Sequence, residues 1–513
     1  MQVKTLVLAV AATLVAAPAF AVSNPETVSG VQKVVMSGAT APDGFIKSAA
    51  EEMLKPGFVT YRNNDLSGAF QHRAWYGQAK AGIPGVAENT PILFVKRSKG
   101  GSVWGVNPVA RASRIESLDF STCTTGGAAD GTTYSYFCAT KGLDPDSPNF
   151  NNPALNNGVV SDMGVSDVAP ALFQAPFNVE FGQTQLTNAE VAALSAFPVN
   201  TLIMSFVATN SVPLSTRITR ADYGNMLMGK IQDWTQIDAN LTGNTQVVVC
   251  RRVNGSGTQA SYNWYFNNFP CQSAFNGFVA PASMGVNGLG GDNASGVIGG
   301  TGTPANPFLI DPTQGYTVVN NSTSGNVRDC LNRAQTKVNH TKVNHTFTGD
   351  DGKTYRILFA NSSEPFKAIG VLSLDSYGSD GTNWTFRNMD GAGSFTPATQ
   401  TASAGATGIA PSKANLLSGA WDFAVELTMQ YRNKTVVNSQ GDSVAAIAGT
   451  KKAFADELIK RSGDPAKIAL NSKQLAYAAV PDFNDPFANA TNEAQVALGS
   501  RGGNMCTPLQ RLY

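Results

Sequence analysis

Short strand-like runs alternate with capped helical segments along this chain, and this order limits the fold more than any other feature. Residues 31–36 are mostly apolar, and Pro42 follows them where the first turn of a helix is expected, because its missing N–H has no helical acceptor there. Further strands are predicted at 199–208 and 246–252, and helices at 186–195, 219–228 and 256–266. This alternation predicts an α/β fold.

Helix boundaries in the middle of the chain are predicted from capping signals. Thr187 and Glu190 have the spacing of a capping box, and Phe197-Pro198 is expected to end the helix that they begin. Ser256 and Gln259 have the same spacing, so Gln259 is expected to complete a second box.

The first 21 residues have the three parts of a secretory signal peptide. Lys4 provides the positive charge, residues 6–15 the apolar stretch, and Ala19-Phe20-Ala21 the small residues at the cleavage site. We therefore expect cleavage after Ala21 and a mature chain in the periplasm, at the cell surface or outside the cell. No later segment has the roughly 18 consecutive apolar residues of a membrane span, so no span is expected after signal removal.

The charge of the chain argues against some partners. Only 14% of the residues are charged and the net charge is +1, which gives no reason to expect nucleic acid or an anionic membrane as a partner. The length is ample for two or three hydrophobic cores. Residues 280–325 and 391–414 are interpreted as loops because of their composition, and the repeated Thr-Lys-Val-Asn-His within 336–346 as a tandem duplication in a surface loop or strand.

Six cysteines in an exported chain predict disulfides. Cys123 and Cys138 flank a Gly-rich turn, which favours a local bridge, and Cys250 and Cys271 flank the helix predicted at 256–266. The remaining two would form a long-range pair, Cys330 with Cys506. Six cysteines allow about fifteen pairings, so only the first two bridges are specific predictions.

Signals for metal binding and catalysis are weak. His72, His340 and His345 form no cluster with ligand spacing, and no C-x-x-C occurs, so neither a metal nor a cofactor is expected. The chain also has no Gly-x-Ser-x-Gly and no His-Glu-x-x-His. We therefore expect that the chain is not an enzyme, although a phosphatase with the α/β fold predicted above is an alternative hypothesis.

Three segments place small polar residues at a helix start or a strand end. Helix N-termini offer unpaired N–H groups and the positive end of the helix dipole, which suit an anion. Arg252 can donate to two oxygens at once, and the neighbouring glycines let the backbone approach closely. The segments are Ser37-Gly38-Ala39-Thr40-Ala41-Pro42, Asp162-Met163-Gly164-Val165-Ser166-Asp167 and Arg252-Val253-Asn254-Gly255-Ser256-Gly257-Thr258. Together they predict a site for a small oxyanion.

A carboxylate in such a site selects between oxyanions. It accepts a hydrogen bond from a protonated ligand oxygen and repels a fully ionised one, so it favours hydrogen phosphate over sulfate. The second segment supplies that carboxylate.

These segments resemble those of the phosphate-binding proteins of bacterial ABC importers, which have the type II periplasmic binding fold. Gly38-Ala39-Thr40 matches the family's Gly-Ala-Thr/Ser, and Gly164-Val165-Ser166-Asp167 matches its Gly-x-Ser-Asp. Residues 252–258 match Arg-x-Asp-Gly-Ser-Gly-Thr except at Asn254. The likeness covers less than half of the chain.

The resemblance implies two lobes, each a mixed sheet flanked by helices, joined by two crossover hinge strands. Phe197-Pro198-Val199 matches the crossing into the second lobe and Ala368-Ile369-Gly370-Val371 the return. The implied division is a signal peptide at 1–21, a first lobe at 22–198 with an insertion at about 55–160, a second lobe at 199–366, and a return to the first lobe with a C-terminal extension at 367–513.

The resemblance also implies the ligand contacts and the partner. Ala41 would contribute a backbone N–H, and Ser102 is the candidate for a further serine of the family. The implied contacts are Thr40, Ala41, Ser102, Asp167, Arg252, Ser256, Gly257 and Thr258. The implied ligand is phosphate or a related oxyanion, and the implied partner is the membrane complex of an ABC importer.

Two departures motivate another hypothesis. Asn254 stands where the family has an Asp that pairs with the arginine, so Arg252 is expected to be less neutralised. The chain also carries large additions. A cell-surface or extracellular protein of the same fold that has lost or changed its ligand is therefore the alternative.

Overall fold

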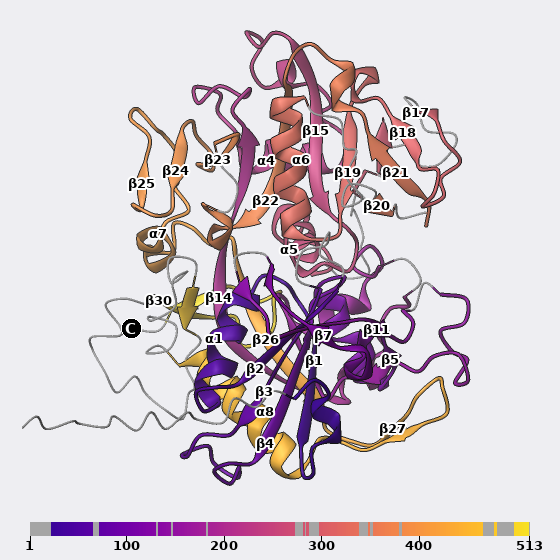
Figure 1. Cartoon of the computed structure of the whole chain (residues 1–513). Coiled ribbons are helices and arrows are strands. Elements are labelled where there is room, and N and C mark those ends of the chain that lie inside the picture. Colours follow the sequence, from indigo (N-terminus) through magenta and orange to yellow (C-terminus); the bar gives the residue numbers. More distant parts are fainter. Residues whose placement is uncertain are drawn as a thin grey trace, which may run out of the picture.

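The computed structural model describes residues 22–64, 71–129, 132–144, 147–180, 183–271, 281–282, 284–286, 297–337, 347–348, 352–378, 382–464, 477–479 and 497–511. The chain forms two lobes, one above the other in Figure 1, each a mixed β-sheet with helices packed on it. The predicted two-lobed α/β fold is confirmed. The predicted signal peptide lies outside the described residues. Among the described helices, none is long and apolar enough to cross a membrane.

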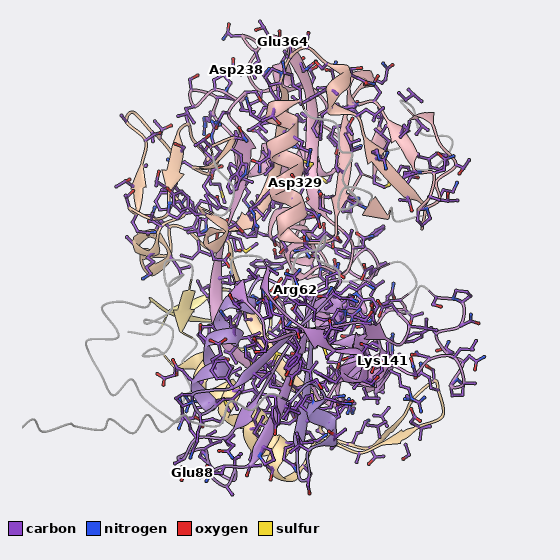
Figure 2. All side chains as sticks on the ribbon, in the orientation of Figure 1. Arg62, Glu88, Lys141, Asp238, Asp329 and Glu364 are labelled. Atoms are coloured by element: carbon purple, nitrogen blue, oxygen red, sulfur yellow. A yellow bond between two sulfur atoms is a disulfide. The ribbon has the colours of Figure 1, made fainter. Side chains whose placement is uncertain are left out.

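The central strands of the first lobe end at one edge of its sheet. β1 (Gln32–Gly38) pairs in parallel with β4 (Pro91–Arg97) on one side and with β13 (Met163–Ser166) on the other. The antiparallel β3 (His72–Gln78) joins β4 to β2 (Val59–Asn63). Figure 2 places Arg62, near the end of β2, where the two lobes meet. The carboxyl ends of these parallel strands therefore face the second lobe.

The helix predicted after Pro42 is present as α1 (Asp43–Met53). Its apolar residues recur at helical spacing, and they form one buried face against the first sheet. These residues are Phe45, Ile46, Ala49, Ala50 and Met53. α8 (Gly449–Gly463) packs beside α1 and against β1.

The second lobe has β15 (Asn244–Arg252) at its centre, in parallel with β19 (Thr317–Asn321) and β22 (Phe366–Ser373). α6 (Ser324–Thr336) lies over these strands in Figure 1. Two further helices of this lobe are α4 (Arg220–Leu227), which begins with a capping box at Thr219, and α5 (Gly257–Asn267).

One long strand, β14 (Leu194–Thr209), runs through both lobes. Its first half pairs with β26 (Ala424–Arg432) in the first lobe and its second half with β22 in the second. The helix predicted at 186–195 is only α3 (Asn188–Val191), and Pro198 does not end it. Pro198 instead lies within β14 beside a register shift, where a ladder can tolerate a residue without an N–H.

The return crossing lies later in the chain than predicted. Residues 368–371 lie in β22, which pairs with β15 and with the second half of β14, so they belong to the second lobe. The chain returns just before β26, where the Met204 N–H donates to the Phe423 carbonyl at 3.0 Å. The indole of the buried Trp421 donates to the Met204 carbonyl at 3.1 Å. The two crossing segments therefore lie side by side.

Both regions interpreted as loops contain strands. Residues 280–325 include β19 and also β17 (Val297–Gly299) and β18 (Phe308–Ile310), which form a small sheet with β21 (Thr354–Ile357). Residues 391–414 include a hairpin of β24 (Ser394–Thr396) and β25 (Thr401–Ala402). These strands are only two to five residues long and lie among residues typical of turns, so composition alone concealed them. Most of the duplication at 336–346, with His340 and His345, lies outside the described residues.

The disulfides are Cys123–Cys138, Cys250–Cys330 and Cys271–Cys506. The first is the predicted local bridge, whereas the predicted pairs Cys250–Cys271 and Cys330–Cys506 are wrong. Cys250 is a buried residue of β15, and Cys330 is a buried residue of α6, which covers that strand. Packing of α6 on the sheet brings these two together, whereas Cys271 lies beyond the far end of α5.

The third disulfide joins the two lobes. Cys506 belongs to a C-terminal segment bound to Glu426 of β26, whose carboxylate accepts from the Arg501 N–H at 2.6 Å and the Gly503 N–H at 2.7 Å. Cys271 follows α5 in the second lobe. Strand β30 (Ala497–Ser500) of the same segment extends the first sheet through β29 (Tyr477–Ala479).

Candidate functional site

The first lobe presents two of the predicted segments side by side. Thr40 and Ala41 follow β1, and Asp167 follows β13, whose ends pair through Gly38 and Val165. Gly38 has a positive φ of 120°, and a Cβ there would lie 2.0 Å from the Val165 carbonyl oxygen. Only glycine fits this close approach. The site therefore lies at the carboxyl edge of parallel strands, where α/β proteins commonly bind ligands.

Ser102 lies between the two lobes. It begins a short 3-10 helix (Ser102–Gly105), and its Oγ accepts the backbone N–H of Asp167 at 3.0 Å. Gly257 of the second lobe touches both residues, because a Cβ on Gly257 would lie 2.3 Å from Ser102 Oγ and 3.0 Å from Asp167 Oδ2. The structure therefore brings Ser102, Asp167 and Gly257 together, as the sequence predicts.

The second lobe contributes Arg252, which is 2% exposed at the end of β15. Its guanidinium donates to the backbone carbonyls of Asn321 at 3.2 Å and Ser322 at 2.9 Å, and to Ser324 Oγ at 3.2 Å. A guanidinium has five N–H donors, so two remain for a ligand. The loop between β19 and α6 thus fixes the orientation of the arginine.

Several backbone donors at the site have no acceptor among the described residues. The N–H groups of Thr40 and Ala41 lie between β1 and α1 and make no hydrogen bond there. Gly257 and Thr258 are the first residues of α5, so their N–H groups have no helical acceptor. Two chain segments, one from each lobe, therefore offer free donors to an anion.

Asp167 provides the acceptor among these donors. It is 4% exposed, and its Oδ1 has no partner among the described groups. Burial raises the pKa of Asp167 to about 6, although Arg252 and the hydrogen bond from Ser102 favour the ionised form. Such a carboxylate is well suited to accept a hydrogen bond from a ligand O–H.

Arg252 has carboxylate neighbours despite Asn254. Burial lowers its pKa, while Asp167, Tyr262 and Glu180 act in the opposite direction. Glu180 lies against Gly255 and accepts a hydrogen bond from Trp104 Nε1 at 2.5 Å. Glu180, distant in sequence, therefore adds a second carboxylate to Asp167 in the electrostatic surroundings of Arg252.

The start of α5 differs from the predicted capping box. Ser256 Oγ accepts the Gln259 N–H at 3.5 Å, as predicted. The Gln259 side chain does not return to Ser256, since it is fully buried and both its polar atoms lack a partner among the described groups. α5 is buried at this end, from Gly257 through Asn263.

Direct hydrogen bonds join the lobes around the site. The Val103 N–H donates to the Gly255 carbonyl at 2.9 Å, and Asn263 Nδ2 donates to Asn178 Oδ1 at 3.2 Å. Gly101 also lies against the arginine, since a Cβ there would be 3.2 Å from Arg252 Nη2. The lobes are thus in direct contact at the predicted site.

Sequence reasoning missed the residues that support the site. Lys96 is buried at the end of β4 and donates to the carbonyls of Gly38 at 3.2 Å and Ala39 at 3.1 Å, which fixes the turn before Thr40. Asp375 is close enough to contribute to the raised pKa of Asp167. These residues and Glu180 lie outside any motif, so no local signal identifies them.

Comparisons with known proteins find similarity only among solved structures. No family model and no curated protein matches the chain. A substrate-binding protein of a phosphate ABC transporter from Clostridium perfringens, with bound phosphate, is 12% identical over 87% of this chain and 99% of its own, with a TM-score of 0.40.

Two further structures are similar. An ABC-type phosphate transport receptor from Vibrio cholerae is 12% identical over 83% of this chain and 93% of its own, with a TM-score of 0.35. A high-affinity periplasmic phosphate-binding protein, PfluDING, is 12% identical over 92% of this chain and 99% of its own, with a TM-score of 0.37.

Proposed function

We propose that this chain is an exported binding protein that holds phosphate, or a closely related oxyanion, between its two lobes. The observation that carries the proposal is the set of free donors converging on one buried acceptor. Thr40, Ala41, Gly257 and Thr258 supply N–H groups without acceptors among the described residues, and the guanidinium of Arg252 keeps two donors. Ser102, Ser256 and Thr258 add hydroxyl groups.

The single carboxylate favours phosphate over sulfate. A hydrogen phosphate has a P–OH group that can donate to Asp167, whereas sulfate has only acceptors at neutral pH and meets a buried carboxylate with repulsion. Arg252 supplies the forked donor that suits a tetrahedral oxyanion.

The site supports binding rather than turnover. The site offers an anion several fixed donors and one buried acceptor, which is the arrangement of a binding site. Delivery of phosphate to an ABC importer after export is the role that we infer. Loss of the ligand, the alternative raised by Asn254, predicts instead that these segments bind no oxyanion.

The proposal is tested by titrating phosphate-free protein with phosphate, sulfate and arsenate in a calorimeter. We expect phosphate and arsenate to bind and sulfate to give no response, because the first two carry a proton at neutral pH. Absence of binding by all three would favour a protein of this fold without an oxyanion ligand.

Two matched alanine variants test whether phosphate binds between the lobes. Gly257→Ala adds a Cβ that would lie 2.3 Å from Ser102 Oγ, whereas Gly44→Ala adds one with no heavy atom within 4 Å. We expect Gly257→Ala to lower phosphate affinity at least about tenfold, since the lobes can no longer meet. Gly44→Ala should bind as the parent does. Equal binding by both variants would place the ligand elsewhere.

A further inference from the structure

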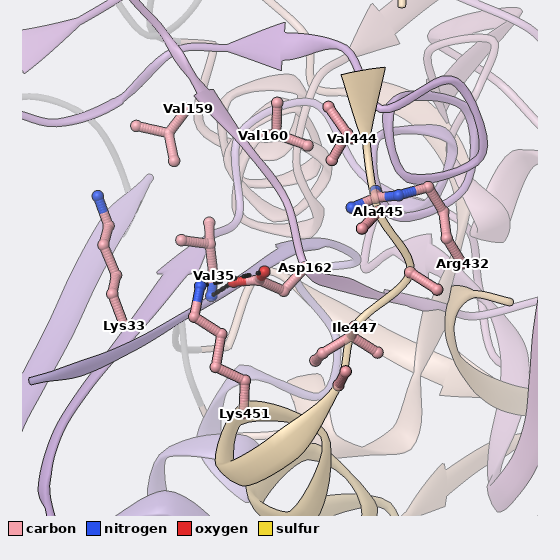
Figure 3. Close-up of a pocket in the computed structure, with 12 residues that line it drawn as sticks. Lys33, Val35, Val159, Val160, Asp162, Arg432, Val444, Ala445, Ile447 and Lys451 are labelled. Carbon is pink, nitrogen blue, oxygen red and sulfur yellow. Dashed lines mark hydrogen bonds and ion pairs between the residues drawn. The ribbon is translucent and has the colours of Figure 1, made fainter. Parts of the chain in front are cut away.

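A cavity of about 350 Å³ lies in the first lobe, away from the cleft. The cleft lies where β1 ends, whereas the cavity lies near the start of β1, between β12 (Val159–Val160) and the loop that leads into α8. Figure 3 shows its lining. The residues around it are Lys33, Val35, Val159, Val160, Asp162, Arg432, Val444, Ala445, Ala446, Ile447, Ala448 and Lys451.

Arg432 is a buried arginine that borders this cavity and has N–H donors that no described group accepts. Arg432 is 2% exposed, and its Nη1 donates to the carbonyls of Val109 and Ser161 at 2.9 Å each. Its Nε has no partner among the described groups, and its Nη2 donates to none of them. Figure 3 shows the side chain extending toward Ala445 across the cavity. No ion pair joins this guanidinium to a carboxylate among the described residues, although Asp162 acts on it electrostatically and favours its charged form.

The N-terminus of α8 meets the same cavity. Its N-cap is Ala448, which has no side-chain oxygen to accept the first N–H groups. The first helical hydrogen bond runs from the Lys452 N–H to the Ala448 carbonyl, so the N–H groups of Gly449, Thr450 and Lys451 make no hydrogen bond with a described group. An anion in the cavity would cap this helix and interact with its dipole.

Charge and polarity together indicate the class of ligand. Lys33, Arg432 and Lys451 line the cavity together with one carboxylate, Asp162, but Lys33 pairs with Glu26 outside it at 2.5 Å, so Arg432 and Lys451 are the cations that the cavity offers. That carboxylate is engaged, because it accepts the Val35 N–H at 2.9 Å and pairs with Lys451 at 3.6 Å. The remaining wall is made of valine, alanine and isoleucine side chains. The cavity therefore suits a small anion that carries a hydrocarbon part.

We propose that this cavity binds a short aliphatic monocarboxylate, with the carboxylate between Arg432 and the N-terminus of α8 and the chain against the valine and alanine wall. This site is independent of the ligand of the cleft. A single negative charge fits better than a phosphate dianion, because Asp162 lies within the same cavity.

The test is a titration of the full chain with hexanoate, compared with acetate, hexan-1-ol, hexylammonium and inorganic phosphate. We expect hexanoate to bind, with affinity rising about fourfold for each methylene from butyrate to hexanoate as more of the chain is buried. The alcohol and the amine should bind at least about tenfold more weakly, since they lack the carboxylate. Equal binding of hexanoate and hexan-1-ol, or no binding of hexanoate, overturns the proposal.

Substitutions inside and outside the cavity test where hexanoate binds. Ala446→Phe should fill the cavity and abolish hexanoate binding, whereas Ala398→Phe, on an exposed turn, should leave it unchanged. Arg432→Lys should weaken it at least about tenfold, because lysine cannot reproduce the forked donors. The thermal unfolding midpoint of each variant, compared with that of the parent, reports that the variant is folded. Hexanoate binding by Ala446→Phe equal to that of the parent contradicts the assignment.

Discussion

Replacing Asp167 with asparagine separates the two roles that we propose for its carboxylate between the lobes. In the proposed complex this residue accepts the hydrogen bond of a protonated ligand oxygen and repels an oxyanion that has none. The asparagine side chain keeps the shape and one acceptor but removes the charge. Its amide can also donate, so a fully ionised oxyanion is no longer rejected.

The size of the effect follows from burial. The pKa of Asp167 is raised from 3.8 to about 6, so at about 1.4 kcal/mol per pKa unit, ionisation costs the folded protein about 3 kcal/mol. A hydrogen bond to a charged group contributes about 1.5–3 kcal/mol, so Asp167→Asn should weaken phosphate binding about 10- to 150-fold. Sulfate should change from no binding to an affinity near that of phosphate.

The contribution of Asp167 to the stability of the parent protein should decrease as pH rises. A carboxyl whose folded pKa is raised binds its proton more tightly in the folded state, so its contribution to stability is complete below about pH 4 and is lost as pH rises through about 6. The free energy of unfolding of the ligand-free parent should fall over this range by up to about 3 kcal/mol relative to Asp167→Asn. Sulfate should begin to bind the parent below about pH 6, where the protonated carboxyl donates.

Calorimetric titration of parent and variant with phosphate and sulfate at pH 8 and pH 5 measures these effects. Asp238→Asn, near the outer end of the second lobe in Figure 2, is the matched control and should behave as the parent. If Asp167→Asn still rejects sulfate at pH 8, the assignment of selectivity to this carboxylate is refuted.

Three further predictions concern groups around the site. Glu180→Gln keeps an acceptor for Trp104 but removes a charge near Arg252, so titration should find phosphate about two- to fivefold tighter; weaker binding would contradict its role as a counter-ion. Arg252→Lys loses the forked donors and should weaken phosphate binding about 10- to 100-fold by titration, and unchanged affinity would remove Arg252 from the site. Replacing Cys271 and Cys506 with serine opens a link across a sequence separation of 235 and should cost about 5 kcal/mol of unfolding free energy in denaturant, against about 3 kcal/mol for the local bridge of separation 15; equal costs would contradict the loop-closure argument.

Local signals in the sequence were sufficient for much of the fold and for the segments of the candidate site. Pro42 and the apolar spacing after it predict α1, and Thr219 predicts α4, because caps and periodicity act within a few residues. The glycines around Gly38 and Gly257 likewise indicate close backbone approach, which the structure has at both positions.

Features that depend on tertiary contacts could not be predicted in this way. The partner of Cys250 is set by the packing of α6 on β15, and Pro198 is accommodated by a register shift against β26. Glu180 reaches the neighbourhood of Arg252 only because the two lobes meet. Nothing within a few residues of these positions carries that information.

A crystal structure of the full chain grown with phosphate tests the central claim most directly. We expect tetrahedral density between the lobes, within hydrogen-bond distance of the Thr40 and Gly257 N–H groups, the guanidinium of Arg252 and the carboxyl of Asp167. Density for phosphate elsewhere on the chain, with none between the lobes at saturating phosphate, would contradict the account.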